Sequence, residues 1–329
     1  MHLTVSILVP VYNTRRYISR CLDSIVKQDY KYTQVVVIDD GSTDGSYSIC
    51  QKYATQYSFI EACSRHHQGV VQTRKDLLQC ATGDYVLFVD SDDWIECNML
   101  SCMMRLIIEH NADISMCGLH YGNHLLCPMN LKQESGIREF NRKETICSLL
   151  NYGGLMNSLC NKLIKRELYK NLKYRDDITV GEDLYMMWQV IPKSERVVCT
   201  PTPYYHYENT AGSLTRQSEI NNLKAACDIW LELERESRKE LPKYTSLLKR
   251  RVFFEVASYS YLLVKDKKAT KATINRLIHI MKRHFPIPLF DSRLQLMKIF
   301  WGAAGVVGGY GLMRAASCAY IKFQKIISN

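Results

Sequence analysis

Residues Ala81-Thr-Gly-Asp-Tyr-Val-Leu-Phe-Val-Asp-Ser-Asp-Asp-Trp94 comprise a turn, a short apolar run and three carboxylates within four residues. An apolar run bounded by glycine and aspartate predicts a buried strand over residues 85–89. Asp90, Asp92 and Asp93 would repel one another after such a strand unless a cation or a donor-rich ligand lay among them. A divalent metal with oxygen ligands is the simplest occupant. The alternative is an acidic turn that caps a following helix, since aspartate is a good N-cap residue.

The segments around this stretch alternate between strand and helix patterns. Further strands are expected over residues 5–9, 34–38, 59–63 and 113–119, and helices between them, including 70–80 and 98–110. Such alternation is typical of a parallel, doubly wound α/β sheet. The strand over 34–38 also runs into carboxylates, Asp39 and Asp40, so two acidic strand ends are expected at one crevice. The first strand leads into neither a G-x-G-x-x-G turn nor a G-x-x-x-x-G-K-[ST] loop, which argues against a Rossmann dehydrogenase and a P-loop kinase.

Length and cysteine usage limit the class of protein. With 329 residues, 47% of them hydrophobic, the chain has room for a large domain with an appendage or for two domains. The 13 cysteines are odd in number, scattered and without a C-x-x-C pair. The apolar run over residues 3–11 lacks the basic flank and the cleavage site of an export signal. We therefore expect reduced thiols and a cytoplasmic location.

The net charge of +10 is unevenly distributed. Residues 224–329 contain 20 Lys and Arg against 8 Asp and Glu. Long helices are expected in this region, over residues 223–240, 244–264 and 270–284. Residues 299–313 form an uncharged run between basic residues, shorter than the about 20 residues of a spanning helix. This run is either a buried helix that docks on the preceding α/β domain or a segment that lies on a bilayer, and the charge favours an anionic membrane surface as a partner.

Two segments between residues 150 and 190 complete the pattern. In the first, the sequence predicts a loop over residues 151–154 and the start of a short basic helix over residues 158–166. Gly181 is followed by Glu182 and Asp183, directly before an apolar helical run over residues 184–190. A helix N-terminus stabilises carboxylates. The acidic pair is therefore either a simple cap or a catalytic base presented at a helix start.

These blocks, in this order and spacing, resemble the family 2 glycosyltransferases, which are inverting, nucleotide-sugar-dependent enzymes with the GT-A fold. The likeness covers residues 3–215, and its matching blocks are Val5–Asn13, Val37–Asp44, Gly83–Asp93 and Gly181–Leu184. It implies an α/β catalytic domain over residues 1–218, with a doubly wound, mostly parallel sheet flanked by helices. A basic helical region, which we expect to associate with a membrane, would follow over residues 219–329.

The resemblance also implies roles for residues that would bind the nucleotide sugar. Pro10 and Tyr12 would line the base pocket, with Tyr12 packing on the ring, and Asp40 would hydrogen-bond the base. Arg74 matches an arginine that precedes the acidic strand in relatives. The asparagine that follows this arginine in the family is Lys75 here, which weakens any transfer of detail about contacts to the donor sugar.

Asp90-Ser91-Asp92 corresponds to the D-x-D motif of the family. The resemblance implies that Asp92 binds Mn²⁺ or Mg²⁺ and that Asp90 or Ser91 reaches the ribose or a metal-bound water. It makes Asp183 the general base. Asp93, to which the resemblance gives no role, is expected to cap the following helix, as aspartate often does.

His206 lies in a segment, residues 204–216, that loosely resembles the part of relatives that closes over the donor. It would be a third metal ligand or a phosphate contact. The alternative is a structural ring, as a lone histidine among tyrosines more often is.

The implied reaction is transfer of a sugar, from a UDP-linked donor in our interpretation, to a hydroxyl of a glycan or lipid-linked glycan. We expect it to serve cell-surface polysaccharide synthesis on the cytoplasmic face of a membrane, as a peripheral protein. The alternatives are a non-catalytic nucleotide-sugar or nucleic-acid binding protein and a sugar nucleotidyltransferase. No nucleic acid is expected as a partner, because no nucleic-acid-binding motif is recognisable and an acidic crevice repels phosphates. The oligomeric state stays open.

Overall fold

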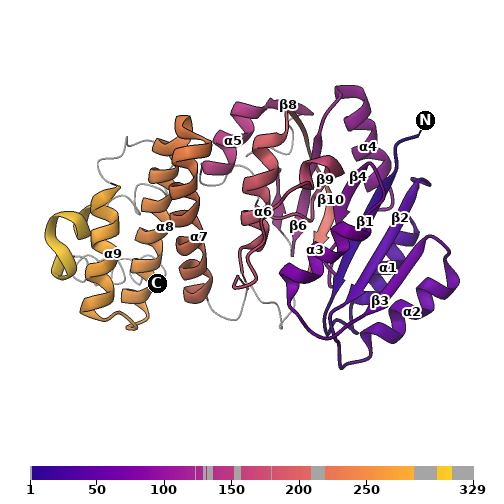
Figure 1. Cartoon of the computed structure of the whole chain (residues 1–329), viewed down its shortest axis with the longest axis horizontal. Coiled ribbons are helices and arrows are strands. Elements are labelled where there is room, and N and C mark those ends of the chain that lie inside the picture. Colours follow the sequence, from indigo (N-terminus) through magenta and orange to yellow (C-terminus); the bar gives the residue numbers. More distant parts are fainter. Residues whose placement is uncertain are drawn as a thin grey trace, which may run out of the picture. The chain divides into compact units, whose positions relative to one another are not determined.

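The computed structural model describes residues 2–122, 124–128, 131, 136–151, 157–178, 180–208, 219–284 and 302–312. The chain divides into two compact units. The first comprises residues 1–149 with 153–213, and the second comprises residues 150–152 with 214–329. In Figure 1 the indigo-to-salmon part carries the sheet of the first unit, and the orange part carries the long helices of the second.

The first half of the sheet is parallel, as the alternation of strands and helices predicts. Its strands lie in the order β3-β2-β1-β4, and every neighbouring pair is parallel. Their bounds are Ile60–Ser64 for β3, Thr33–Asp39 for β2, Val5–Val11 for β1 and Tyr85–Phe88 for β4. Because β1, β2 and β4 run in one direction, their carboxyl ends, and the acidic residues after β2 and β4, lie at the same edge.

Beyond β4 the sheet is mixed and continues in the order β9-β6-β10-β5. β9 is antiparallel to both β4 and β6, whereas β6 and β10 are parallel to each other. Short antiparallel strands pair with this half: β5 and β8 with β10, and β7 with β6. The bounds are Trp94–Ile95 for β5, Ile114–Tyr121 for β6, His124–Leu126 for β7, Arg138–Asn141 for β8, Lys162–Lys165 for β9 and Arg196–Tyr207 for β10.

The sequence-based expectation for residues 158–166 is therefore wrong, because residues 162–165 form the central strand β9. The segment Lys-Leu-Ile-Lys is short and has a charge at each end, so it carries no local strand pattern. Its conformation comes from antiparallel pairing with β4 and β6, which lie far away in the sequence.

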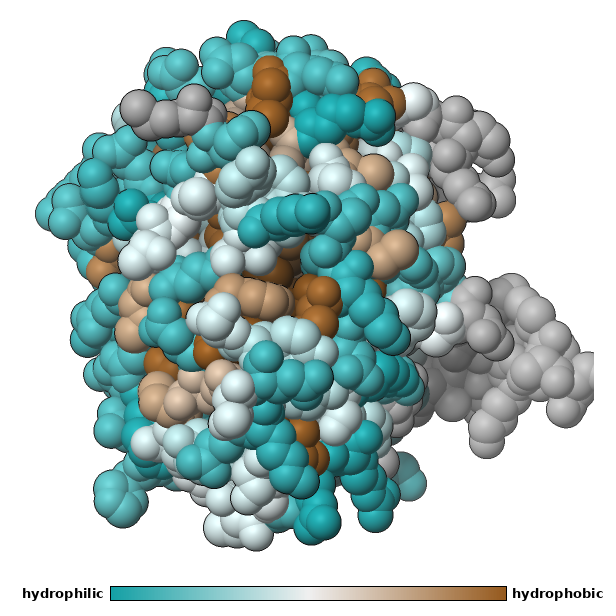
Figure 2. All heavy atoms as spheres, turned by 90° about the vertical axis from the view of Figure 1, so that its right-hand side faces the viewer, coloured by the Kyte–Doolittle hydropathy of each residue, from teal (hydrophilic) through white to brown (hydrophobic). Residues whose placement is uncertain are grey.

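Helices cover both faces of the sheet, as the doubly wound fold predicts. They are α1 (Ile18–Val26), α2 (Ser46–Gln56), α3 (Val70–Cys80), α4 (Met99–His110), α5 (Arg142–Leu150) and α6 (Glu182–Val190), with short 3₁₀ turns at Arg166–Tyr169 and Ile191–Lys193. Figure 2, which views the right-hand side of Figure 1, shows mostly hydrophilic side chains with small, scattered hydrophobic patches.

Side chains alternate between the two faces of the sheet, and this alternation positions the functional residues. One face packs with α1 and α4 in a buried cluster that includes the strand residues Val9, Leu87, Leu119, Leu163 and Tyr205. The residues next to these in each strand point to the opposite face: Phe88, His120, Lys162 and His206. Arg74 of α3 lies on that face, with its guanidinium carbon 5.9 Å from the ring centre of Phe88.

The turn before β4 depends on Gly83. A Cβ atom at this position would lie 2.5 Å from the backbone nitrogen of Ser6 in β1. The missing side chain lets this turn approach β1 closely, and Gly83 N–H donates to Ser6 Oγ at 2.8 Å. Close packing against β1 therefore requires a glycine at position 83, the first residue of the block Gly83–Asp93.

The second unit is helical, and its long helices fall where the sequence predicts them. They are α7 (Glu219–Glu240), α8 (Thr245–Lys265) and α9 (Lys271–Arg283), with a 3₁₀ turn at Pro242–Tyr244. The described part of the apolar run, residues 302–312, is also helical. Gly302 allows this helix to approach α8, since a Cβ there would lie 2.4 Å from the ring of Phe253. No helix in the described part of the chain is both long and apolar enough to cross a membrane.

Candidate active site

The ends of β1 and β2 bring three of the predicted donor-binding residues together. Pro10 pairs with Ile38 across the two strands, and Asp40 N–H donates to Val11 O at 2.8 Å. The ring of Tyr12 is 47% exposed and stacks on His67, with ring centres 4.3 Å apart. An exposed aromatic face beside a carboxylate suits a planar base with hydrogen-bonding edges.

The carboxylate of Asp40 is buried and holds the loop that precedes α3. It accepts hydrogen bonds from the backbone N–H groups of Gln68 and Gly69 at 3.0 and 2.8 Å. Arg65 Nε and His67 Nδ1 lie 3.2 and 2.9 Å from its two oxygens. Asp40 therefore fixes the ring of His67, and through it the stack with Tyr12, in addition to any contact with a base.

A buried arginine, Arg74, connects the acidic strand end to the acidic helix start. Its side chain is 5% exposed, and it ion-pairs with Asp90 at 3.3 Å, with Glu182 at 2.5 Å and with Asp183. Burial opposes the charge of Arg74, but Asp183 and Glu182 hold its pKa above the usual value. The structure thus brings together Arg74, Asp90 and Asp183, which lie in three separate sequence blocks.

The start of α6 presents both carboxylates to Arg74. Gly181 adopts a left-handed conformation with a φ of 90°, after which Glu182 and Asp183 occupy the first helical turn. Burial raises the pKa of Asp183 to about 7, against the lowering effect of Arg74, and Glu182 and Asp90 raise it further. The Leu159 N–H donates to Asp183 Oδ2 at 3.2 Å. A carboxylate whose pKa lies near neutrality is well matched to general base catalysis.

In the loop after β4, Ser91 is buried and Asp92 is partly exposed, and hydrogen bonds hold both residues in place. The hydroxyl of Ser91 accepts a hydrogen bond from Thr14 Oγ1 at 3.0 Å. The backbone carbonyl of Asp92 accepts from Arg20 at 3.1 Å, and Arg20 also ion-pairs with Glu208 at 2.9 Å. The loop is therefore tied to the segments after β1 and β10.

The expectation that Asp93 caps the following helix is wrong. The helix α4 begins at Met99, with Asn98 at its N-cap position. Asp93 is 1% exposed, and its carboxyl contacts Tyr205 Oη at 2.6 Å and accepts from Glu208 N–H at 2.8 Å. Burial, with smaller effects of Asp90 and Asp92, raises the pKa of Asp93 to about 9. Asp93 is too early in the chain to cap α4, because β5 lies between them. Its carboxyl instead bonds to Tyr205 of β10 and to Glu208 just after that strand.

The oxygen ligands at this strand end fit a divalent metal ion for which the protein supplies only some of the ligands. Among the described residues, no group of three His, Cys, Asp or Glu side chains could hold a metal ion. Asp93 is bonded to Tyr205 and Glu208, and Asp90 is paired with Arg74. Mg²⁺ and ions like it are commonly bound by one or two carboxylates together with substrate phosphates and waters. Asp92, with Asp90 or Ser91 beside it, matches that pattern.

His206 contacts other aromatic rings and a glutamate. It is in register with Trp94 of β5 and His120 of β6. The three rings stack, with centres 3.4 and 4.7 Å apart, and His206 Nε2 lies 2.7 Å from Glu96. Burial lowers the pKa of His206. These contacts are the ones that the structural alternative for this residue predicts, and the metal-ligand role remains a prediction.

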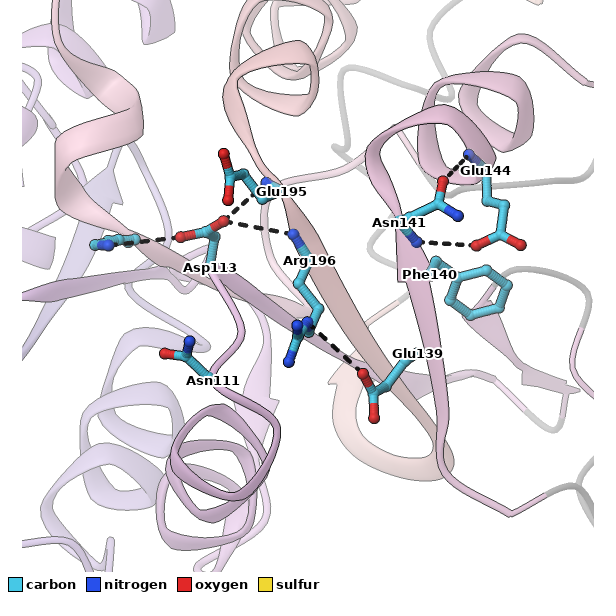
Figure 3. Close-up of a pocket in the computed structure, with 9 residues that line it drawn as sticks. Asn111, Asp113, Glu139, Phe140, Asn141, Glu144, Glu195 and Arg196 are labelled. Atoms are coloured by element: carbon cyan, nitrogen blue, oxygen red, sulfur yellow. Dashed lines mark hydrogen bonds and ion pairs between the residues drawn. The ribbon is translucent and has the colours of Figure 1, made fainter.

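A separate pocket of about 600 Å³ lies near the start of β6 and β10, at the sheet edge opposite to Asp90 (Figure 3). Its charged side chains contact one another or nearby backbone. Asp113 accepts from the Glu195 N–H at 2.8 Å, and Arg196 lies 3.7 Å from Glu139. None of the residues predicted for catalysis or donor binding lines this pocket.

Comparisons with known proteins identify the family and the fold. The family model "Glycosyl transferase family 2" matches residues 6–173. Residues of this chain are 32% identical over 221 positions to the glycosyltransferase GlyA of Streptococcus pneumoniae, covering 64% of this chain and 31% of that protein. The S. aureus TarS 1–349 structure in complex with UDP-GlcNAc superimposes with a TM-score of 0.75 at 19% identity, over 97% of this chain and 92% of that one.

A mannosyltransferase from Pyrobaculum calidifontis, solved with GDP-Man and Mn²⁺, is a more distant structural neighbour. It has a TM-score of 0.54 and 15% identity, over 98% of this chain and 86% of that one. The fold is thus of the GT-A class, a central mixed sheet flanked by helices. The chain belongs to glycosyl transferase family 2.

Three residues in this site were not assigned from the sequence: Glu182, Tyr205 and Lys162. Glu182 shares Arg74 with Asp183, and its position in the Glu-Asp pair was a usable signal. Tyr205 contacts the Asp93 carboxyl and accepts from Asp90 N–H at 3.2 Å. Lys162 lies in β9, which has no local strand pattern. Tyr205 and Lys162 gave no sequence signal, because their roles arise from strand pairing.

We expect Tyr205→Phe to lower the free energy of unfolding by about 1–3 kcal/mol, since it leaves buried hydrogen-bonding groups of Asp93 and Asp90 unpaired. Urea denaturation followed by circular dichroism measures this change. Tyr121→Phe is the matched control, because Tyr121 is 37% exposed and should change stability by less than about 0.5 kcal/mol. Equal effects of the two substitutions would contradict the role given to Tyr205.

Proposed function

We propose that this protein is an inverting glycosyltransferase that moves a sugar from a UDP-linked donor to an acceptor hydroxyl in a single displacement. The observation that carries the proposal is the cluster around Arg74, which joins Asp90 of the D-x-D motif to Asp183 of the acidic helix start. A donor held at Asp90-Ser-Asp92 would then have its sugar beside a carboxylate with a pKa near neutrality.

Asp183 is the proposed general base. In its ionised form it takes the proton of the acceptor hydroxyl as that oxygen attacks the anomeric carbon, and a positioned base contributes about 10²–10⁴-fold to the rate. Arg74 and the Leu159 N–H hold its two oxygens in place. Attack from the face opposite to the nucleotide inverts the anomeric configuration. Glu182 also pairs with Arg74, and the choice of Asp183 as the proton acceptor rests on its pKa of about 7, to which burial raises it.

Donor binding would use the residues at the carboxyl ends of β1, β2 and β4. Pro10, Tyr12 and Asp40 would receive the base, and Arg74 would contribute positive charge near the donor. Asp92, with Asp90 or Ser91, would hold Mn²⁺ or Mg²⁺ against the diphosphate. When bound, such an ion acts as a Lewis acid that stabilises the charge on the leaving group. The Mn²⁺ in the P. calidifontis neighbour supports this choice of metal.

The proposed donor class is a UDP-hexose or UDP-N-acetylhexosamine, supported by UDP-GlcNAc in the complex of the TarS neighbour. The proposed acceptor is a glycan or a lipid-linked glycan in cell-surface polysaccharide synthesis. TarS is described as a poly(ribitol-phosphate) β-N-acetylglucosaminyltransferase and is 29% identical over 209 residues. Release of UDP from a panel of nucleotide sugars with Mn²⁺ identifies the donor.

Asp183→Asn should lower turnover by at least about 10²-fold, because an amide cannot accept the proton. Its affinity for the donor should change little, since the substitution keeps the shape of the side chain. UDP release measures turnover, and isothermal titration calorimetry measures donor affinity. Asp177→Asn is the control, as Asp177 is 67% exposed and pairs with Arg175. A variant Asp183→Asn with near-normal turnover would exclude Asp183 as the base.

Asp92→Ala should weaken donor binding in the presence of Mn²⁺ and abolish the difference in affinity that EDTA makes for the unmodified protein. The physical reason is that a carboxylate lost from the ion's coordination shell lowers metal affinity, and with it the contact to the diphosphate. Calorimetric titration with UDP, with and without EDTA, measures both effects. Donor affinity that is the same in all four experiments would refute the assignment of Asp92 to a metal.

We further propose that the protein binds the cytoplasmic face of a membrane through a basic surface on the second unit. Exposed lysines and arginines gather at the end of α8 and along α9: Lys265, Lys267, Lys268, Lys271, Arg276, Lys282 and Arg283. Over residues 265–284 the one acidic residue is Asp266. Each basic side chain near an anionic bilayer contributes about 1 kcal/mol of attraction. In the helix over residues 302–312, Val307 is 81% exposed and offers an apolar contact.

The triple variant Lys265→Glu, Lys268→Glu and Lys282→Glu should lose binding to vesicles that contain phosphatidylglycerol, and should not change binding to neutral vesicles. Co-sedimentation measures the bound fraction. The control changes three exposed lysines of the first unit to glutamate, Lys31, Lys52 and Lys170, which gives the same net charge. If both triple variants lost binding equally, total charge and not this surface would be responsible.

A further inference from the structure

Lys162 is a buried lysine that the proposed reaction does not use. It is the first residue of β9 and is 1% exposed. Its Nζ donates to the Ser158 carbonyl at 2.5 Å and to Asn161 Oδ1 at 2.7 Å. Both acceptors are neutral, and burial lowers the pKa of Lys162 to about 8. A buried ammonium costs free energy unless it is well paired.

The Ser158 carbonyl and the Leu159 N–H belong to the same peptide group. The ammonium of Lys162 donates to the oxygen of this peptide. The N–H of the same peptide, that of Leu159, donates to Asp183 Oδ2 at 3.2 Å. A hydrogen bond from an ionised donor is stronger than a neutral one, and successive hydrogen bonds polarise one another. The ammonium therefore makes the Leu159 N–H a better donor to the carboxylate.

We propose that Lys162 is a positioning residue for Asp183, acting through the Ser158–Leu159 peptide to orient this carboxylate and to favour its ionised form. This inference takes from the proposed function only the role of Asp183 as the general base. Arg74 holds Oδ1 of the carboxylate from α3, and the peptide holds Oδ2 from the segment before β9. Because each oxygen has its own partner, the two contacts together fix the orientation of the carboxylate in the site.

The groups around this pair set the sign of the effect. Arg74 from α3, Glu182 on α6 and Asp90 after β4 act on Asp183, and Tyr169 also lies within its field. Around Lys162 are Asp183 and the thiols Cys160, Cys199 and Cys117, which all favour its charged form. Loss of a positive charge beside a carboxylate raises the carboxylate's pKa. Removing Lys162 must therefore move the titration of Asp183 to higher pH.

The test is titration of the Asp183 carboxyl by NMR in full-length protein labelled with ¹³C at the aspartate side-chain carboxyl, with the signal assigned by its loss in Asp183→Asn. Lys162→Met should raise the titration midpoint by about one pH unit. Lys193→Met is the matched control, since Lys193 Nζ also donates to backbone carbonyls, those of Leu168 and Lys170 at 3.1 and 2.7 Å. An unchanged midpoint in Lys162→Met would overturn the proposal.

A reciprocal measurement does not require Lys162→Met to fold. The coupling between two titrating groups is mutual, so Asp183→Asn should lower the pKa of Lys162, read from ¹⁵N-lysine spectra, by a similar amount. A Lys162 titration that is the same in both proteins would also refute the link. Neither readout needs catalysis. An inactive protein with the expected shifts would thus reject the proposed function and keep this inference, and an active protein without them would do the opposite.

Discussion

The ion pairs of the buried Arg74 are the constraint on which the site depends. An arginine stays charged under all ordinary conditions, and in an interior it needs close carboxylates to offset the loss of water. Asp90, Glu182 and Asp183 meet this need from two different elements. Removal of one partner from such a pair generally costs about 3–5 kcal/mol, because a charge is left uncompensated. Arg74 thus requires the strand end after β4 and the start of α6 to lie together.

The carboxylates of the candidate site have different environments and therefore different tasks. Asp93 is enclosed, with its pKa raised to about 9, and attaches β10 through Tyr205 and Glu208. Asp183 has a pKa of about 7 and faces the site beside Arg74. Pairs of titratable groups whose surroundings separate their pKa values are typical of acid–base catalysis. The division supports Asp183 as the base and leaves Asp92 as the choice for the metal.

Much of the fold and part of the site were predictable from local patterns. The buried runs of β1, β2 and β4 and the apolar spacing of the helices identify a parallel α/β sheet, and the acidic strand ends indicate where a ligand binds. Three errors or omissions share one cause. Residues 162–165 form a strand because they pair with β4 and β6. Asp93 contacts a tyrosine 112 residues away, and the peptide that Lys162 contacts donates to Asp183, 24 residues beyond Leu159. No window of local sequence contains these partners.

The sequence by itself determined the order of the strands and helices, the aspartates at the carboxyl ends of β2 and β4, and the carboxylate pair at the start of α6. It did so because hydrophobic periodicity and turn residues act over a few neighbours. Only the tertiary structure decided which of the carboxylates after β4 is buried, which residues share Arg74, and that a lysine lies behind the proposed base. These depend on burial and on charges brought together across the sheet, since a carboxyl's protonation follows its surroundings in space and not its place in the chain.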